Sequence, residues 1–193
     1  MYMKSESGVK NSEKKALPVW AIILAFGVLL AFLGLLALGL RNAKEGPIAV
    51  GQTVTPFELV TFDGEVYNTG DYSGKVILIN FWASWCQPCE SEAAELEEAW
   101  RYYEPTGDVI FLGVDYVDTE PEARAYLEEY EITFPNGPDL RTSISQMFRI
   151  LGVPETYIIN ANGELAYVKK GPFYDTAEII FAVDDVLQGS QKE

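Results

Sequence analysis

The chain has 193 residues, contains no histidine and only two cysteines, and carries a formal net charge of −15 at pH 7. The absence of histidine argues against a His-ligated metal site and against Ser–His or Cys–His catalytic pairs. Two cysteines cannot supply the four ligands of a structural zinc site within one chain.

The negative charge is concentrated after the first 45 residues. Residues 1–45 hold six Lys or Arg and three acids, so residues 46–193 hold 14 − 6 = 8 bases and 29 − 3 = 26 acids, a net charge of −18. Such a region repels nucleic acid, and we expect no nucleic-acid partner. The simplest interpretation is a solvated acidic surface, and attraction of basic partners is the alternative.

The N-terminal region has the pattern of a membrane anchor. A polar tail at residues 1–17 precedes residues 18–40, which carry no charge. At about 1.5 Å per residue, a helix of this length crosses the roughly 30 Å hydrocarbon core. Signal-peptide apolar regions are only about 7–15 residues long, which favours an uncleaved anchor over a cleaved signal, although residues 37–39 resemble a cleavage site. Four lysines in the tail favour a cytoplasmic N-terminus and a cytoplasmic membrane location, with the rest of the chain outside.

A linker at residues 41–50 leads into one expected domain at residues 51–193, in which strands alternate with helices. Apolar runs at 76–82 and 109–114 are typical of strands buried on both faces. The other expected elements are short strands at 57–60 and 65–67 around Asp63-Gly64, helices that start after Cys86 and span 120–130, 144–151 and 176–187, and a hairpin of strands 156–159 and 165–168. This order predicts an α/β three-layer domain with a mixed sheet.

Apolar spacing predicts the inner faces of the first two helices. The first helix should face the sheet with Cys89, Ala93, Leu96, Trp100 and Tyr103, and the second with Ala123, Leu127 and Tyr130. The acids Glu90, Glu95, Glu97 and Glu98 are expected to form a solvated face.

Both cysteines stand at the junction between a predicted strand and a predicted helix. Cys86 and Cys89 are two residues apart, a spacing that predicts a thiol–disulfide redox pair in this context. Cys86 would lie among unpaired N–H groups at the positive end of the helix dipole, which favour its thiolate. The thiolate is the species that attacks a disulfide. Glu90 follows Cys89 where c-type haem attachment requires histidine.

The segment FWASWCQPC, residues 81–89, resembles the active-site segment of thioredoxin-like proteins, and the fuller pattern is similar to the membrane-anchored TlpA/ResA/CcmG branch. The other shared positions are Gly51, Pro56-Phe57, Asp63-Gly64, Gly74-Lys75, Gly152 to Thr156 and Asn162-Gly163. The resemblance covers about residues 51–188. It implies a thioredoxin-like fold with an N-terminal β-hairpin, a mixed central sheet and an inserted helix within residues 117–135.

The resemblance also implies a substrate-binding surface beside the cysteines. Pro154 matches the family's cis-proline. Trp85 on one side and Val153-Pro154 on the other are expected to flank an exposed Cys86 sulfur. A cis X-Pro bond turns the backbone sharply, so neighbouring backbone groups can face an incoming chain. A trans turn proline is the alternative.

Glu92 is a candidate proton carrier for Cys89. It lies one helical turn after Cys89 and matches a glutamate of this branch. A partly buried carboxylate there would exchange a proton with Cys89, whereas the alternative is one more solvated helix acid. Asn80 stands where cytoplasmic thioredoxins carry a buried Asp, which transfers any proton-relay role to Glu92.

These features predict a thiol-disulfide oxidoreductase that uses Cys86 and Cys89 and needs no cofactor. Gln87-Pro88 keeps the proline of reducing thioredoxins and favours a reductase of protein disulfides. The resemblance implies a membrane thiol carrier of the CcdA or DsbD type as electron donor, and apocytochrome c as a substrate.

Several other functions remain as alternatives. An oxidase that donates disulfides fits the same motif, and a redox-inactive binding module is the non-enzyme alternative, although it would normally lose one cysteine. A peroxiredoxin would need a Pro-X-X-X-Thr/Ser-X-X-Cys pattern, and a copper chaperone would need Cys-X-X-X-Cys and a histidine. The sequence contains neither pattern.

Overall fold

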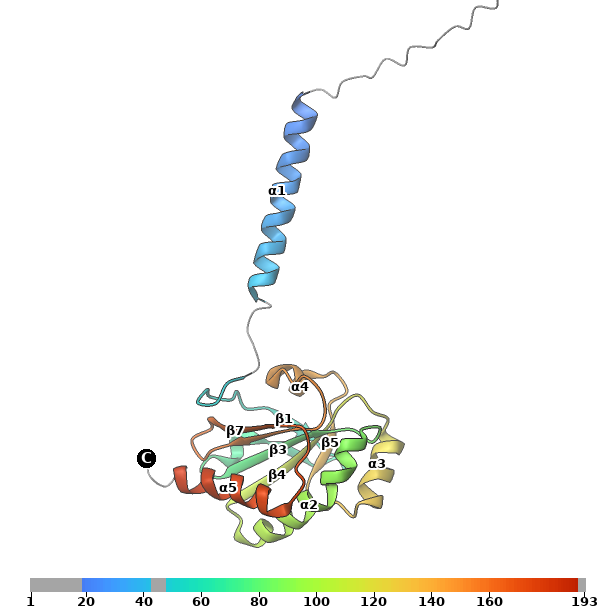
Figure 1. Cartoon of the computed structure of the whole chain (residues 1–193), viewed down its shortest axis with the longest axis vertical. Coiled ribbons are helices and arrows are strands. Elements are labelled where there is room, and N and C mark those ends of the chain that lie inside the picture. Colours follow the sequence, from blue (N-terminus) through green and yellow to red (C-terminus); the bar gives the residue numbers. More distant parts are fainter. Residues whose placement is uncertain (1–18, 43–47, 191–193) are drawn as a thin grey trace, which may run out of the picture. The chain divides into compact units, whose positions relative to one another are not determined.

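The computed structural model describes residues 19–42 and 48–190 (Figure 1). The chain divides into two compact units, Met1–Glu45 and Gly46–Glu193. The predicted tail at 1–17, the first residue of the predicted span, linker residues 43–47 and the last three residues of the chain lie outside the described ranges.

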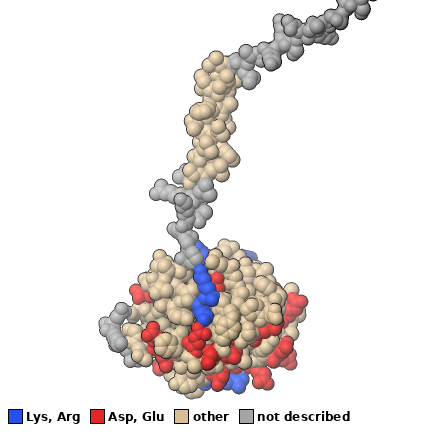
Figure 2. All heavy atoms as spheres, viewed as in Figure 1, with Lys and Arg blue, Asp and Glu red and all other residues tan. Residues whose placement is uncertain are grey.

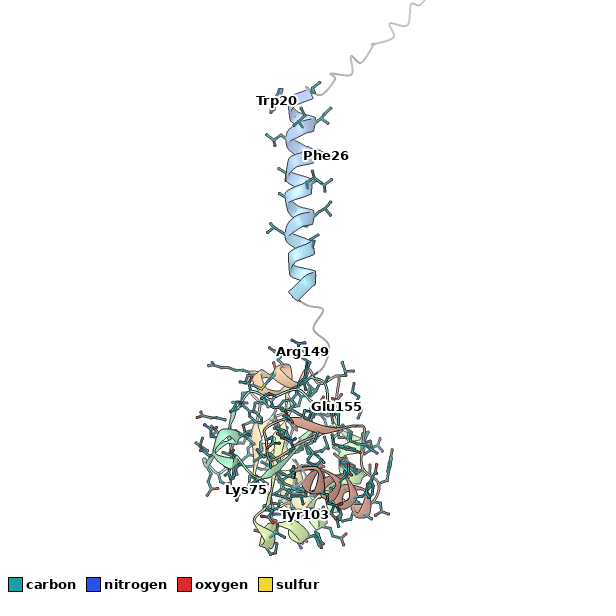
Figure 3. The ribbon with its side chains drawn as sticks, turned by 90° about the vertical axis from the view of Figure 1, so that its left-hand side faces the viewer. Trp20, Phe26, Lys75, Tyr103, Arg149 and Glu155 are labelled. Carbon is teal, nitrogen blue, oxygen red and sulfur yellow. A yellow bond between two sulfur atoms is a disulfide. The ribbon has the colours of Figure 1, made fainter. Side chains whose placement is uncertain are left out.

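The first unit contains one long helix, α1 (Val19–Asn42). Its segment Val19–Ala37 has a mean hydropathy of 2.8 and is long and apolar enough to cross a membrane. Side chains along this segment are exposed, and Figure 3 shows Trp20 and Phe26 projecting outward from the helix. The length and apolar composition of this helix fit a membrane anchor.

The second unit is built on a five-stranded mixed sheet. Its strands lie in the order β5 (Asn136–Pro138), β4 (Val109–Asp115), β3 (Val76–Trp82), β6 (Glu155–Ile159) and β7 (Leu165–Lys170). Strand β4 runs parallel to both β3 and β5, and β6 is antiparallel to both β3 and β7. The predicted mixed sheet is therefore confirmed, with β5 as an additional strand that the sequence pattern did not indicate.

The remaining elements surround this sheet (Figure 1). They are the hairpin β1 (Glu58–Val60) and β2 (Val66–Asn68), the short 3-10 helices Thr69–Tyr72 and Glu104–Thr106, and the helices α2 (Gln87–Tyr103), α3 (Glu120–Glu129), α4 (Ser143–Phe148) and α5 (Thr176–Ser190). Each predicted helix and strand of the domain is present, with slightly different ends.

Alternation along β3 divides the core into two layers. Val76 and Leu78 pack with α2 and α5 on one face, whereas Ile77, Ile79 and Phe81 pack with α4 and the N-terminal hairpin on the other. Successive side chains of a strand point to opposite faces, so Asn80 lies on the α2 side. This places a buried amide against the helix that starts at the cysteines.

One expectation about helix faces is incomplete and another is wrong. In α3, Ala123, Leu127 and Tyr130 pack in or against the core as expected, with Leu127 and Tyr130 half-buried. The pattern missed Tyr126, which is buried and stacks on Trp82 with ring centroids 4.5 Å apart. In α2, Glu97 is buried rather than solvated. It accepts hydrogen bonds from the Thr133 N–H at 2.8 Å and the Thr133 hydroxyl at 2.6 Å, which offset the cost of burying it.

Gly137 lets the hairpin of β1 and β2 approach the edge of the sheet closely, so a larger residue at this position should destabilise the fold. A Cβ at this position would lie 2.2 Å from the Val60 carbonyl oxygen, a backbone atom that cannot move aside alone. We expect Gly137→Ala to lower the free energy of unfolding by about 1–3 kcal/mol, as overpacking does. Urea unfolding of the full-length oxidised protein in detergent, followed by fluorescence, measures the change.

Gly189→Ala in α5 is the matched control, because a Cβ there meets no atom within 4 Å. It should leave the unfolding midpoint unchanged or raise it slightly. Equal midpoints for both variants would contradict the close approach of β5 to β1.

Candidate active site

The two cysteines form a disulfide at the N-terminus of α2. Cys86 is the N-cap of the helix, and the Cys89 N–H lies 3.2 Å from its sulfur. Pro88, in the first turn, has no N–H to satisfy, which suits the start of a helix. After reduction, the free N–H groups and the helix dipole favour the thiolate of Cys86 over the thiol. The predicted position at a helix start is confirmed.

Neither sulfur is freely open to solvent in the disulfide form. Cys86 is 3% exposed and Cys89 is 1% exposed, so the expectation of an exposed Cys86 sulfur is wrong for this state. Both residues pack in a cluster with Trp82, Ala83 and Ala93, because α3 covers this end of the sheet. Gln87 and Pro88, between the cysteines, are exposed and form the outer surface of the site.

Glu92 is buried more completely than its predicted partial burial, at 1% exposure. Its Oε1 accepts a hydrogen bond from Asn80 Nδ2 at 2.8 Å, and its Oε2 accepts one from the Phe173 N–H at 2.9 Å. Asn80 Nδ2 also donates to Thr156 Oγ1 at 3.0 Å. The carboxyl group therefore joins α2 to β3 and to the segment before α5, and Asn80 extends this network to β6.

The environment of Glu92 raises the pKa of its carboxyl group to about 7, with burial as the largest cause. Hydrogen bonds from Phe173 and Asn80 oppose this shift, as does the charge of Lys169. An isolated carboxyl in water would be almost fully ionised at neutral pH. Glu92 thus changes protonation state near neutral pH, one helical turn from Cys89.

The peptide bond between Val153 and Pro154 is cis, as predicted. Val153 packs against the cluster that contains both cysteines, so this loop lies beside the disulfide. Pro154 itself is buried, and its carbonyl accepts a hydrogen bond from the Gly171 N–H at 2.9 Å.

Glu155 supports this loop, a role that the sequence pattern did not indicate. It is 4% exposed and accepts hydrogen bonds from the Leu151 N–H at 3.0 Å and from the Tyr157 hydroxyl at 2.6 Å. Figure 3 labels Glu155 within the domain. In the sequence, Glu155 stood out only as one residue of the shared segment from Gly152 to Thr156. Its hydrogen-bond partners could not be predicted, because they depend on how the loop folds.

Trp85 is 59% exposed and lies on the opposite flank. Its indole Nε1 donates to the Val117 carbonyl at 3.1 Å, and the neighbouring Ser84 N–H donates to Asp118 Oδ2 at 2.6 Å. The loop after β4 therefore fixes the segment that precedes Cys86. Asp115, at the end of β4, and Asp118, in this loop, were not predicted as part of the site.

The titration of Glu92 predicts a pH dependence of stability. Its pKa is about 7 in the folded protein against an ordinary value of 4.5, so between these pH values the folded protein keeps a proton that the unfolded chain has lost. The free energy of unfolding should therefore fall as pH rises through this window, by about 3 kcal/mol in total. Glu92→Gln should remove this part of the pH dependence, which urea unfolding from pH 4 to pH 8 measures.

Glu90→Gln, at an exposed acid of the same helix, is the matched control and should keep the wild-type slope. If Glu92→Gln shows the same slope as the wild type, Glu92 is ionised throughout and the account of its burial is wrong.

The similarity to known proteins agrees with this geometry. The chain is 30% identical to the thiol-disulfide oxidoreductase ResA of Geobacillus kaustophilus over 144 residues, covering 75% of this chain and 82% of that protein. It is 31% identical to the thioredoxin-like protein YneN of Bacillus subtilis over 131 residues, covering 67% and 76%. The solved thiol:disulfide interchange protein of Chlorobium tepidum superposes with a TM-score of 0.65 at 25% identity, covering 75% of this chain and 99% of that one.

The family model described as the AhpC/TSA family matches residues 50–168, which include both cysteines and Pro154. The domain has the thioredoxin-like fold, and its Cys-X-X-Cys pair forms a disulfide. The chain belongs to the AhpC/TSA family and is a thiol-disulfide oxidoreductase of the ResA-like kind.

Proposed function

We propose that the chain is a membrane-tethered reductase of protein disulfides on the extracytoplasmic side of the cytoplasmic membrane, with Cys86 and Cys89 as its catalytic pair. The observation that carries the proposal is the position of Cys86 at the N-cap of α2, where the Cys89 N–H meets its sulfur. That position favours the nucleophilic thiolate at one cysteine of the pair.

The reaction proceeds by two exchanges of a disulfide bond. The Cys86 thiolate attacks one sulfur of the substrate disulfide, so a mixed disulfide forms and the other substrate sulfur leaves as a thiolate. The Cys89 thiolate then attacks the Cys86 sulfur, and the second substrate thiolate leaves. The enzyme loses two electrons and ends with the Cys86–Cys89 disulfide, while the substrate gains two electrons and, with two protons, becomes a dithiol.

Glu92 serves this scheme as the acceptor of the Cys89 proton. Cys89 is buried, which disfavours its thiolate, so a nearby base assists the second attack. A carboxyl group with a pKa of about 7 has a useful fraction of its ionised form at neutral pH. Asn80 positions this group through its 2.8 Å hydrogen bond.

Substrate binds across Trp85 on one flank and Val153-Pro154 on the other. The exposed indole offers an apolar surface, and Gln87 and Pro88 lie between the two flanks on the outer surface of the site. Burial of the disulfide in its oxidised form favours release of the product over further attack from solution.

The membrane arrangement follows from the N-terminal segments. Residues 1–17 form a cytoplasmic tail, 18–40 the anchor, 41–50 a linker and 51–193 the thioredoxin-like domain. Helix α1 supports the anchor by its length and composition, and the lysines of the tail support its orientation.

The partners in this proposal come from the family resemblance. Reducing equivalents arrive from a membrane thiol carrier of the CcdA or DsbD type, and apocytochrome c, through the disulfide of its haem-binding motif, is a substrate. The reverse reaction, donation of a disulfide, uses the same geometry, so the reduction potential of the pair decides between the reductase and an oxidase.

Substitution of single cysteines tests the order of attack. Cys89→Ser should accumulate a mixed disulfide between Cys86 and the natural substrate, because the second exchange is blocked. Cys86→Ser should accumulate none, because the attacking thiolate is missing. Non-reducing gels of membrane extracts, with mass spectrometry of the trapped species, measure the result.

The double variant Cys86→Ser/Cys89→Ser controls for adducts formed at neither cysteine. Trapping by Cys86→Ser instead of Cys89→Ser would reverse the assigned roles. Full activity in the cell without either cysteine would favour the redox-inactive binding module.

A further inference from the structure

A cavity of about 370 Å³ opens beside Trp85, on the flank of the site formed by the loop after β4. Trp85, Asp115, Val117, Asp118, Glu122 and Leu140 line this cavity, which we call the Trp85 pocket. Because Trp85 directly precedes Cys86, their Cα atoms are only about 3.8 Å apart. The pocket therefore lies next to the redox pair. A substrate side chain that enters the pocket while Cys86 attacks comes from a residue close in the substrate sequence to the attacked cysteine.

One carboxyl oxygen in the Trp85 pocket lacks a hydrogen-bond partner. Asp115 is only 2% exposed, and its Oδ1 has no partner among the residues that the structure describes. The side chain of Asp118 hydrogen-bonds with Asp115, and its Oδ2 and Oδ1 also accept from the Ser84 and Thr119 N–H groups. A buried carboxyl oxygen without a donor is costly and rare, so a donor that reached Asp115 from the pocket would be favoured.

The charge of the pocket selects a cationic ligand. Asp118 and Glu122 add negative charge beside Asp115, and no Lys or Arg is among the described residues that line the pocket. Burial, followed by the charge of Asp118 and a hydrogen bond with Asp118, raises the pKa of Asp115 to about 8. A cation beside Asp115 opposes the effect of the Asp118 charge and favours the carboxylate.

The rim of the pocket selects a cation with an apolar stem. Trp85, Val117 and Leu140 are 59%, 58% and 82% exposed, so apolar surface surrounds the acidic interior. Lys and Arg side chains place methylene groups on such surface and direct their charge beyond it, and a guanidinium group also stacks on an indole. A bare metal ion is less suitable, since the described residues contain no group of three acid, His or Cys side chains able to hold one.

We propose that the Trp85 pocket binds a lysine or arginine side chain of the substrate protein, next to the substrate cysteine that forms the mixed disulfide with Cys86. The inference rests on the proposed function, because it takes the substrate to be a protein disulfide. It makes the enzyme selective for disulfides that have a basic residue as a neighbour.

Two peptides that differ only in charge test the proposal. Each is a short peptide with one internal disulfide, and one cysteine is flanked on both sides by arginine in the first and by neutral citrulline in the second. The rate at which reduced full-length protein, in detergent, reduces each peptide is measured at constant ionic strength. We expect the arginine peptide to react about tenfold faster, as a contact between a buried carboxylate and a cation allows.

Variants of the pocket are compared by the ratio of these two rates. Asp115→Asn should lower the ratio to about two or less. Glu122→Gln, at an exposed position that does not threaten the fold, should lower it by a smaller factor. Asp185→Asn is the matched control, because it removes one negative charge from an exposed position on α5 and should leave the ratio unchanged.

Each outcome has a distinct meaning. A wild-type ratio near one, or a ratio that neither Asp115→Asn nor Glu122→Gln lowers, overturns the pocket while the exchange function stands. An equal fall in Asp185→Asn attributes the preference to the overall negative charge of the domain and also overturns the pocket. Failure of the wild type to reduce either peptide contradicts the proposed function, and the pocket proposal falls with it.

Discussion

The buried carboxyl group of Glu92 connects the elements that form the active site. It lies on α2, one turn after Cys89, and receives hydrogen bonds from Asn80 on β3 and from the Phe173 N–H before α5. Burying a carboxyl group is unfavourable unless donors compensate for lost water, so these bonds constrain where α2 can sit on the sheet. The N-terminus of α2, and with it Cys86, takes its position from this arrangement.

Two loops, one on each side of the disulfide, hold the residues that surround it. On one side the cis peptide bond at Pro154 and the carboxylate of Glu155 fix a loop whose Val153 packs beside the cysteines. On the other, the loop after β4 holds Ser84 and Trp85 through Asp118 and the Val117 carbonyl. Acidic side chains outnumber basic ones on the face of the domain shown in Figure 2, and such a surface attracts basic partners and repels acidic ones.

Local patterns predicted much of the fold and the centre of the site. The apolar run of β3, the stripe of α2 and the Cys-X-X-Cys spacing each depend on residues close in sequence. Strand β5 was missed because Asn, Gly and Pro are poor strand formers, and only pairing with β4 makes it a strand. The roles of Asp115, Asp118 and Glu155, and the full burial of Glu92, arise from contacts between loops and elements that no local pattern specifies.

The central claim is that this pair of cysteines gives electrons to protein disulfides. Equilibration of the full-length protein with glutathione or dithiothreitol buffers at pH 7, followed by counting of free thiols, measures its reduction potential. The account predicts one reversible two-electron transition closer to the thioredoxin value of about −270 mV than to the value of about −120 mV found for a strong disulfide donor. A potential near −120 mV would make the protein an oxidase, and the absence of a two-electron transition would contradict dithiol exchange altogether.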